Sequence, residues 1–123
     1  MSAGELRSRW DGPFFGVQGD GFEARFVLGS AAEVDAVENV DVFVRLADGT
    51  EWTATVFTLA EVHRLMDRWA VSGDAQAGAY FWCWDGLIVR DAGVASMAGV
   101  IAGLVASGEV RQVLRSSAQE SAA

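Results

Sequence analysis

The strongest constraint on the fold is the stretch 40–57, in which two alternating segments flank an Ala-Asp-Gly sequence. Apolar side chains at every second position are typical of strands with one buried face. A two-residue Asp-Gly loop would pair Val44 with Thr53 and mix the two faces. A three-residue loop with a left-handed Gly49 pairs Val44 with Trp52 and gathers the apolar side chains on one face. Because burial fixes strand register, we predict the three-residue loop, a type I turn with a G1 bulge.

An earlier hairpin is predicted from two apolar runs, residues 14–18 and 22–28, which flank Gly19-Asp20-Gly21. The second run alternates with a period of two, as expected of a half-buried strand. The small and acidic residues 29–39 then connect this hairpin to the one over 40–57.

Helical signals follow the second hairpin. Thr58 and Glu61 have the spacing of a capping box. The apolar residues behind them recur at three-and-four spacing, which is typical of an amphipathic helix: they are Leu59, Val62, Leu65, Met66 and Trp69. A last helix is predicted over 92–107, with Asp91 as its cap.

Between the helices, Tyr80–Trp84 is almost wholly aromatic and is predicted as a strand, with 87–90 as a further strand after a turn. The resulting order is β-β-β-β-α-β-β-α. Strands first and helices late predict an α+β fold, with an antiparallel sheet and two helices packed on one face. We expect one domain over residues 1–123, with 1–12 as a mobile leader and 116–123 as a frayed tail.

The charge balance restricts the partners of the chain. Its 17 acidic and 9 basic residues give a formal net charge of −8. Nucleic acids and anionic membrane surfaces need Lys or Arg to neutralise phosphate, so we expect neither as a partner. The apolar stretches are too short to span a membrane, and the first ten residues lack the apolar core of a signal peptide. The cytoplasm is the expected location.

No residue pattern points to catalysis. His63 is the single histidine, and no nucleophile or orienting group is adjacent to it in the sequence. Cys83, the single cysteine, lies between two tryptophans and is expected to be buried and inert. The carboxylates lack the spacing of a calcium loop, and the glycines lack that of a phosphate-binding loop. We therefore expect no enzyme, no cofactor and no metal.

The acidic connection has two interpretations. Its carboxylates belong to a solvated loop, or they form a negative patch that docks a basic partner. The candidate partner-binding acids are Glu33, Asp35, Glu38 and Asp41.

The aromatic run also has two interpretations. As a strand it would place Tyr80, Trp82 and Trp84 on one face, and Phe81 and Cys83 on the other. One set belongs to the core. The other set is covered by a helix, by a second subunit or by a partner, and Trp82 and Trp84 are the candidate aromatic anchors of an interface.

The order of features over about half the chain carries a family resemblance. A strand ending at residues 46–49 is followed by Trp-Thr-Ala-Thr-Val-Phe-Thr at 52–58 and a helix containing Leu65-Met66. Gly-Ala-Tyr-Phe-Trp at 78–82 then leads to Gly-Leu-Ile-Val at 86–89 and an apolar helix. This pattern resembles small uncharacterised bacterial proteins that are similar to immunity proteins of polymorphic toxin systems. The resemblance implies a small, acidic, cytosolic protein without catalytic residues that binds one cognate toxin domain.

The sequence thus favours a non-enzymatic binding protein, specifically an immunity protein that neutralises a toxin by direct binding, with a basic toxin domain as the candidate partner. The alternative is a small homodimer that binds an apolar ligand or serves a biosynthetic cluster as an accessory protein. Phe43 and Phe57, on the otherwise polar face of the hairpin, are consistent with a covered surface. A closed pocket lined by aromatic side chains would favour the ligand-binding alternative.

Overall fold

The computed structural model describes residues 6–29 and 33–117 and shows an α+β fold. The predicted class is confirmed, and the predicted succession of two hairpins, a helix, a strand (predicted over 87–90, found at 86–89) and a last long helix is present. The elements are β1 (Arg7–Asp11), β2 (Phe14–Gly19), β3 (Phe22–Val27), β4 (Asn39–Leu46), β5 (Glu51–Thr58), α1 (Leu59–Ser72), α2 (Asp74–Gly78), β6 (Gly86–Val89), α3 (Val94–Ser107), α4 (Val110–Val113) and β7 (Arg115–Ser116).

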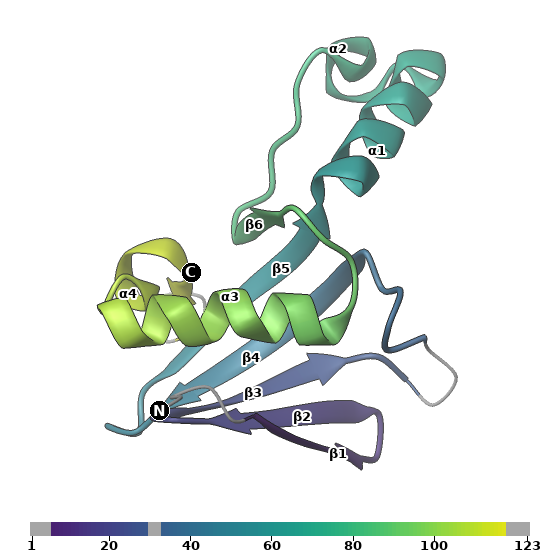
Figure 1. The fold of residues 1–123 in the computed structure, drawn as a ribbon. Helices are drawn as coiled ribbons and strands as arrows, with labels where there is room; N and C mark the ends of the chain where they lie inside the picture. The colour runs from purple at the N-terminus through teal and green to yellow at the C-terminus, as the bar shows by residue number, and fades with distance from the viewer. Residues whose placement is uncertain (1–5, 30–32, 118–123) are drawn as a thin grey trace.

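The strands form one sheet in the order β1-β2-β3-β4-β5-β6, and the short β7 also pairs with β5. Neighbouring strands are antiparallel except for β5 and β6, which are parallel. A parallel neighbour needs a crossover connection, and α1 with the segment behind it supplies one. Figure 1 shows this connection rising from the end of β5 and returning to β6.

The register of the β4–β5 hairpin is the predicted one. Val44 pairs with Trp52, and the amide of Leu46 donates to the carbonyl of Thr50 at 2.9 Å. Gly49 has a φ of 86°, the left-handed conformation that a three-residue loop requires. The inward-facing residues of both strands are therefore apolar and lie on the same face of the sheet.

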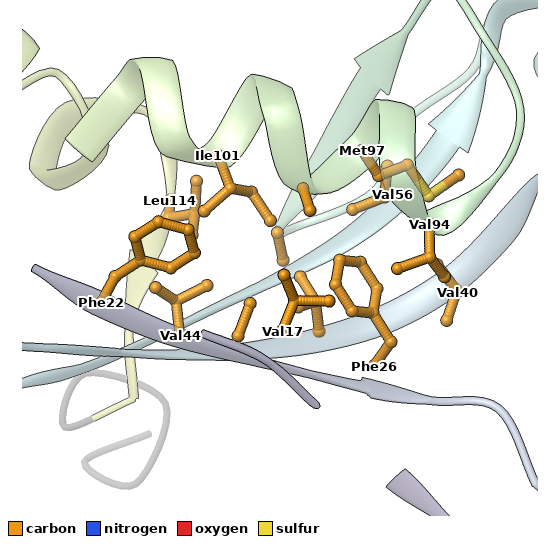
Figure 2. Close-up of a cluster of buried hydrophobic side chains, with 14 of the residues drawn as sticks. Val17, Phe22, Phe26, Val40, Val44, Val56, Val94, Met97, Ile101 and Leu114 are labelled. Atoms are coloured by element: carbon orange, nitrogen blue, oxygen red, sulfur yellow. The ribbon is translucent and has the colours of Figure 1, made fainter. Parts of the chain in front are cut away.

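The main core lies between that face and α3, which crosses the sheet (Figure 1). Phe22 and Phe26 of β3 point towards Met97 and Ile101 of the helix, as Figure 2 shows. Met97 and Ile101 are at most 1% exposed. Leu114, the residue that follows α4 in the chain, lies at one end of this cluster.

Helix α1 contributes no residue to this core. It begins directly at the end of β5, because Thr58 is both the last strand residue and the N-cap, whose hydroxyl accepts from the amide of Glu61 at 3.0 Å. No turn separates strand from helix, so α1 continues beyond the sheet instead of folding back across it (Figure 1). Val62 is its one buried residue.

Three segments differ from the sequence prediction. Residues 7–11, assigned to a mobile leader, form the edge strand β1, which pairs with β2 across a turn at Gly12-Pro13. The strand predicted at Tyr80–Trp84 is wrong: this segment is irregular. Residues 86–89 already occupy the edge beside β5, and the preceding residues only lead the chain from α2 back to the sheet (Figure 1). Ser116, the first residue of the predicted frayed tail, belongs to β7 and pairs with Trp52 of β5. Residues 1–5 and 118–123 of the predicted leader and tail lie outside the described residues.

Candidate protein-binding site

The segment 80–84 exposes aromatic side chains although it is not a strand. Trp82 is 71% exposed, Tyr80 48% and Trp84 36%, and these three residues are called the aromatic ridge below. Phe81 and Cys83, between them, are half-buried. The alternation predicted for the two faces is therefore present, and the outward set is the one that contains Trp82 and Trp84.

A small aromatic cluster fixes the ridge from beneath. The ring of Phe81 packs edge-on against Phe57 of β5, with centroids 4.9 Å apart, and stacks on Trp69 of α1 at 5.8 Å. Phe57 is only 6% exposed as a result. Phe57, one of the two phenylalanines on the otherwise polar face of the hairpin, is thus covered by its own chain, and its burial needs no second subunit.

The turn before the ridge has a strained backbone. Ala75, Gln76 and Ala77 have φ values of 51°, 54° and 59°. A left-handed conformation costs roughly 1–2 kcal/mol for each residue that carries a Cβ. Strain of this kind is concentrated at functional sites, where the surrounding structure holds it in place. Here Gly78 lies against the backbone of α1, because a Cβ built on it would be 2.2 Å from the carbonyl oxygen of Met66.

The end of the segment nearer the sheet is tied down by hydrogen bonds. The Asp85 carboxylate accepts from the hydroxyl of Thr55 at 2.9 Å and from that of Thr53 at 3.4 Å. The Arg115 guanidinium donates to the carbonyl of Trp84 at 3.0 Å and lies 5.4 Å from the centre of its ring. With both ends held, the ridge would need little ordering to bind a partner, and less ordering favours affinity.

The thiol of Cys83 lies beneath the ridge and donates to the carboxylate of Asp85 at 3.6 Å. Burial raises the pKa of the Cys83 thiol, and the backbone hydrogen bond to Asp85 opposes this only in part. A thiol with a raised pKa carries little of the thiolate that acts as nucleophile and metal ligand. The environment of Cys83 therefore favours a packing role.

The four predicted acids do not share one environment. The Glu38 carboxylate accepts from the Thr58 hydroxyl at 2.8 Å and from Arg64 at 2.6 Å, and these hydrogen bonds, that from Arg64 foremost, lower its pKa. Asp41 accepts from the Thr55 hydroxyl at 3.0 Å on the open face of the sheet. These two carboxylates are engaged within the chain.

Glu33 and Asp35 remain exposed. The loop that carries Glu33 and Asp35 is held against α3, because the amide of Val94 donates to the carbonyl of Val34 at 2.9 Å. The half-buried Val34 also packs on the main core. Of the predicted acids, Glu33 and Asp35 are therefore the ones whose position suits a role in docking.

No family model matches the chain, and searches of curated proteins and of solved structures find no match. The candidate functions therefore have to be compared by geometry.

The described residues contain no group of three or more His, Cys, Asp or Glu side chains that could hold a metal ion. None of the helices in the described ranges is both long and apolar enough to cross a membrane. His63 lies on the exposed side of α1, where its Nδ1 is 3.2 Å from Asp67.

Sequence reasoning separated the two sets of side chains in 80–84, but it left open which set points outward and did not find the contacts that hold it. The contacts of Phe81 with Phe57 and Trp69 join residues far apart in the chain, and no local pattern encodes them. Gly73 and Gly78 were the available signal for the turn, since two glycines at this spacing allow a left-handed path. The left-handed residues between them carry no signal of their own.

Proposed function

We propose that this chain is a non-enzymatic binding protein that holds one protein partner against the aromatic ridge. The observation that supports this most directly is the position of Trp82, which is 71% exposed on a segment fixed at both ends. An exposed tryptophan on a rigid support is the residue type that most often anchors a protein interface. A tryptophan that served only the fold would be expected in the core.

The partner that we propose is a toxin domain, which the chain neutralises by direct binding in the bacterial cytoplasm, as an immunity protein does. The net charge of −8 supports a partner with a basic surface, because opposite charges speed the encounter of two proteins. The exposed Glu33 and Asp35 are the predicted acids free to contribute. The same charge disfavours nucleic acids and anionic membranes.

Capture of the partner tests this proposal. The tagged full chain is expressed in the native host, and proteins that co-purify with it are identified. We expect one partner, encoded beside this chain in a gene for a secreted multidomain toxin. If no protein is retained and no toxin gene is adjacent, the immunity function is wrong.

Two variants then locate the interface by stopped-flow and surface-binding kinetics. Trp82→Ala should raise the dissociation rate by about 30-fold, equivalent to about 2 kcal/mol for an interface anchor. Trp10→Ala is the matched control. Trp10 is also exposed, at 42%, but it lies on β1, at the edge of the sheet opposite to β6. Glu33→Gln with Asp35→Asn should mainly slow association and weaken its salt dependence. Wild-type kinetics in both test variants would place the interface elsewhere.

A further inference from the structure

The face of the sheet opposite α3 holds a depression of about 340 Å³ over β1, β2 and β3. It lies at the edge of the sheet farthest from β6 and the aromatic ridge, so the proposed function does not use it. Its lining includes three arginines, Arg7, Arg9 and Arg25, and one strand glycine, Gly16. Its volume is at the lower end of the range for small-molecule sites.

The strand register explains how the depression forms. Arg9 pairs with Gly16 across β1 and β2, and Gly16 pairs with Arg25 across β2 and β3. Directly paired residues point to the same face, so the two arginines flank a position without a side chain. Two strand spacings separate their Cα atoms by about 10 Å. Long, flexible arginine side chains can therefore converge above Gly16 from both sides.

The charges at this site are unusual for so acidic a chain. Among the described residues, no salt bridge joins Arg7, Arg9 or Arg25 to a carboxylate, whereas Arg45 and Arg64 are paired with glutamates. The Arg25 guanidinium lies 5.1 Å from the centre of the Phe14 ring, a contact that restricts its orientation.

Two carboxylates limit what the site can accept. Asp11 and Glu23 also line the depression, and with the three arginines they leave a formal charge of +1. A polyanion that extended along the sheet would meet both acids. A compact anion centred over Gly16 would meet the arginines first, because Arg9 and Arg25 are the direct strand partners of Gly16.

We propose that this depression binds a small oxyanionic ligand, whose phosphate or carboxylate group lies between Arg9 and Arg25 over Gly16. The planar guanidinium group matches the paired oxygens of both anions and binds them through two parallel hydrogen bonds. Phosphate and carboxylate share this chemistry, and the test distinguishes them. The site does not depend on the proposed function, since the aromatic ridge contributes no residue to it.

The test is a titration of the full chain, followed by amide chemical shifts. Inorganic phosphate and succinate are added separately, each against sodium chloride of the same ionic strength. We expect saturable shifts at the amides of Gly16 and Arg25 with at least one probe, and the tighter probe identifies the preferred group. Arg9→Gln and Arg25→Gln should each weaken binding about tenfold or more, because each removes a charge-assisted pair of hydrogen bonds. Arg68→Gln, on the exposed side of α1, is the matched control and should bind as wild type does.

Gly16→Val separates binding from folding. A Cβ at residue 16 would have the carbonyl oxygen of Arg9 as its one close neighbour, at 3.7 Å, which is ordinary van der Waals contact. A β-branched residue also favours a strand, so this variant should fold at least as stably as wild type. The new side chain fills the floor of the depression and should abolish anion binding. The proposal is overturned by unsaturable shifts with both probes, by normal binding in Gly16→Val, or by an equal loss in Arg68→Gln.

Discussion

A glycine-to-alanine pair tests whether the close approach of the strained turn to α1 holds the aromatic ridge in place. Gly73 and Gly78 flank this turn, and both have left-handed φ values, 92° and 80°. Their surroundings differ. A Cβ at residue 73 meets nothing within 4 Å, whereas one at residue 78 would be 2.2 Å from the Met66 carbonyl oxygen and 3.0 Å from the Ala70 amide nitrogen.

The expected magnitudes follow from this difference. In Gly73→Ala the left-handed alanine costs roughly 1–2 kcal/mol, and the less flexible unfolded chain offsets about 0.4–1 kcal/mol of that. In Gly78→Ala the same terms apply, and the clash with helix backbone adds about 1–3 kcal/mol, as overpacking typically does. We therefore expect Gly78→Ala to lower the free energy of unfolding by about 1–3 kcal/mol more than Gly73→Ala does.

Urea denaturation of both variants measures the free energies, and near-ultraviolet circular dichroism reports the environment of Trp69 stacked on Phe81. The spectrum is needed because the segment could detach locally in Gly78→Ala, which would change the aromatic signal while part of the clash is relieved. Equal stabilities together with unchanged aromatic spectra would refute the reasoning, since Gly78 would then not depend on its contact with α1.

Two further predictions concern the β4–β5 turn. Gly49→Val should destabilise the protein by more than about 1 kcal/mol, because a β-branched side chain disfavours the left-handed φ of 86°, and thermal unfolding measures this. Asp48 accepts from Thr50 and Arg111, and these hydrogen bonds lower the pKa of its carboxyl in the folded protein. Its stabilising effect is therefore complete above the ordinary aspartate pKa and is lost as the pH falls through the lower folded-state value. Melting temperature should decline more steeply below about pH 4 in wild type than in Asp48→Asn, and equal slopes would contradict this.

The main sheet could be predicted because its signals are local and agree with one another. In the β4–β5 hairpin, alternation, turn residues and burial all select one register, and Val44 pairs with Trp52 as predicted. Strand β1 was missed because all five of its residues are exposed and give no apolar alternation. Its available signals were the Gly12-Pro13 turn and the charges of Arg7, Arg9 and Asp11, which stand at every second position.

The path from α1 to β6 could not be predicted from local patterns. The aromatic residues 80–84 have high strand propensity, but a strand also needs a free neighbour, and β6 pairs with β5 at that edge. Helix α1 ends at the left-handed C-cap Gly73, and the chain then returns to β6 through the left-handed turn and the contact of Phe81 with Trp69. The sequence therefore separated the aromatic side chains into two sets but left open which set points outward, because this depends on contacts between distant residues.

The sheet itself determines where binding surfaces are available. Because α3 covers one face, the side chains that alternate with the core residues of β2–β5 lie on the other face. At the β5 edge that face is closed by Phe81 over Phe57, and the covering segment presents Trp82 outward. At the β1 edge nothing among the described residues fills the position over Gly16, and arginines flank it. An apolar anchor and an anion site at opposite edges of one rigid sheet should act independently, so Trp82→Ala should leave phosphate or succinate binding unchanged.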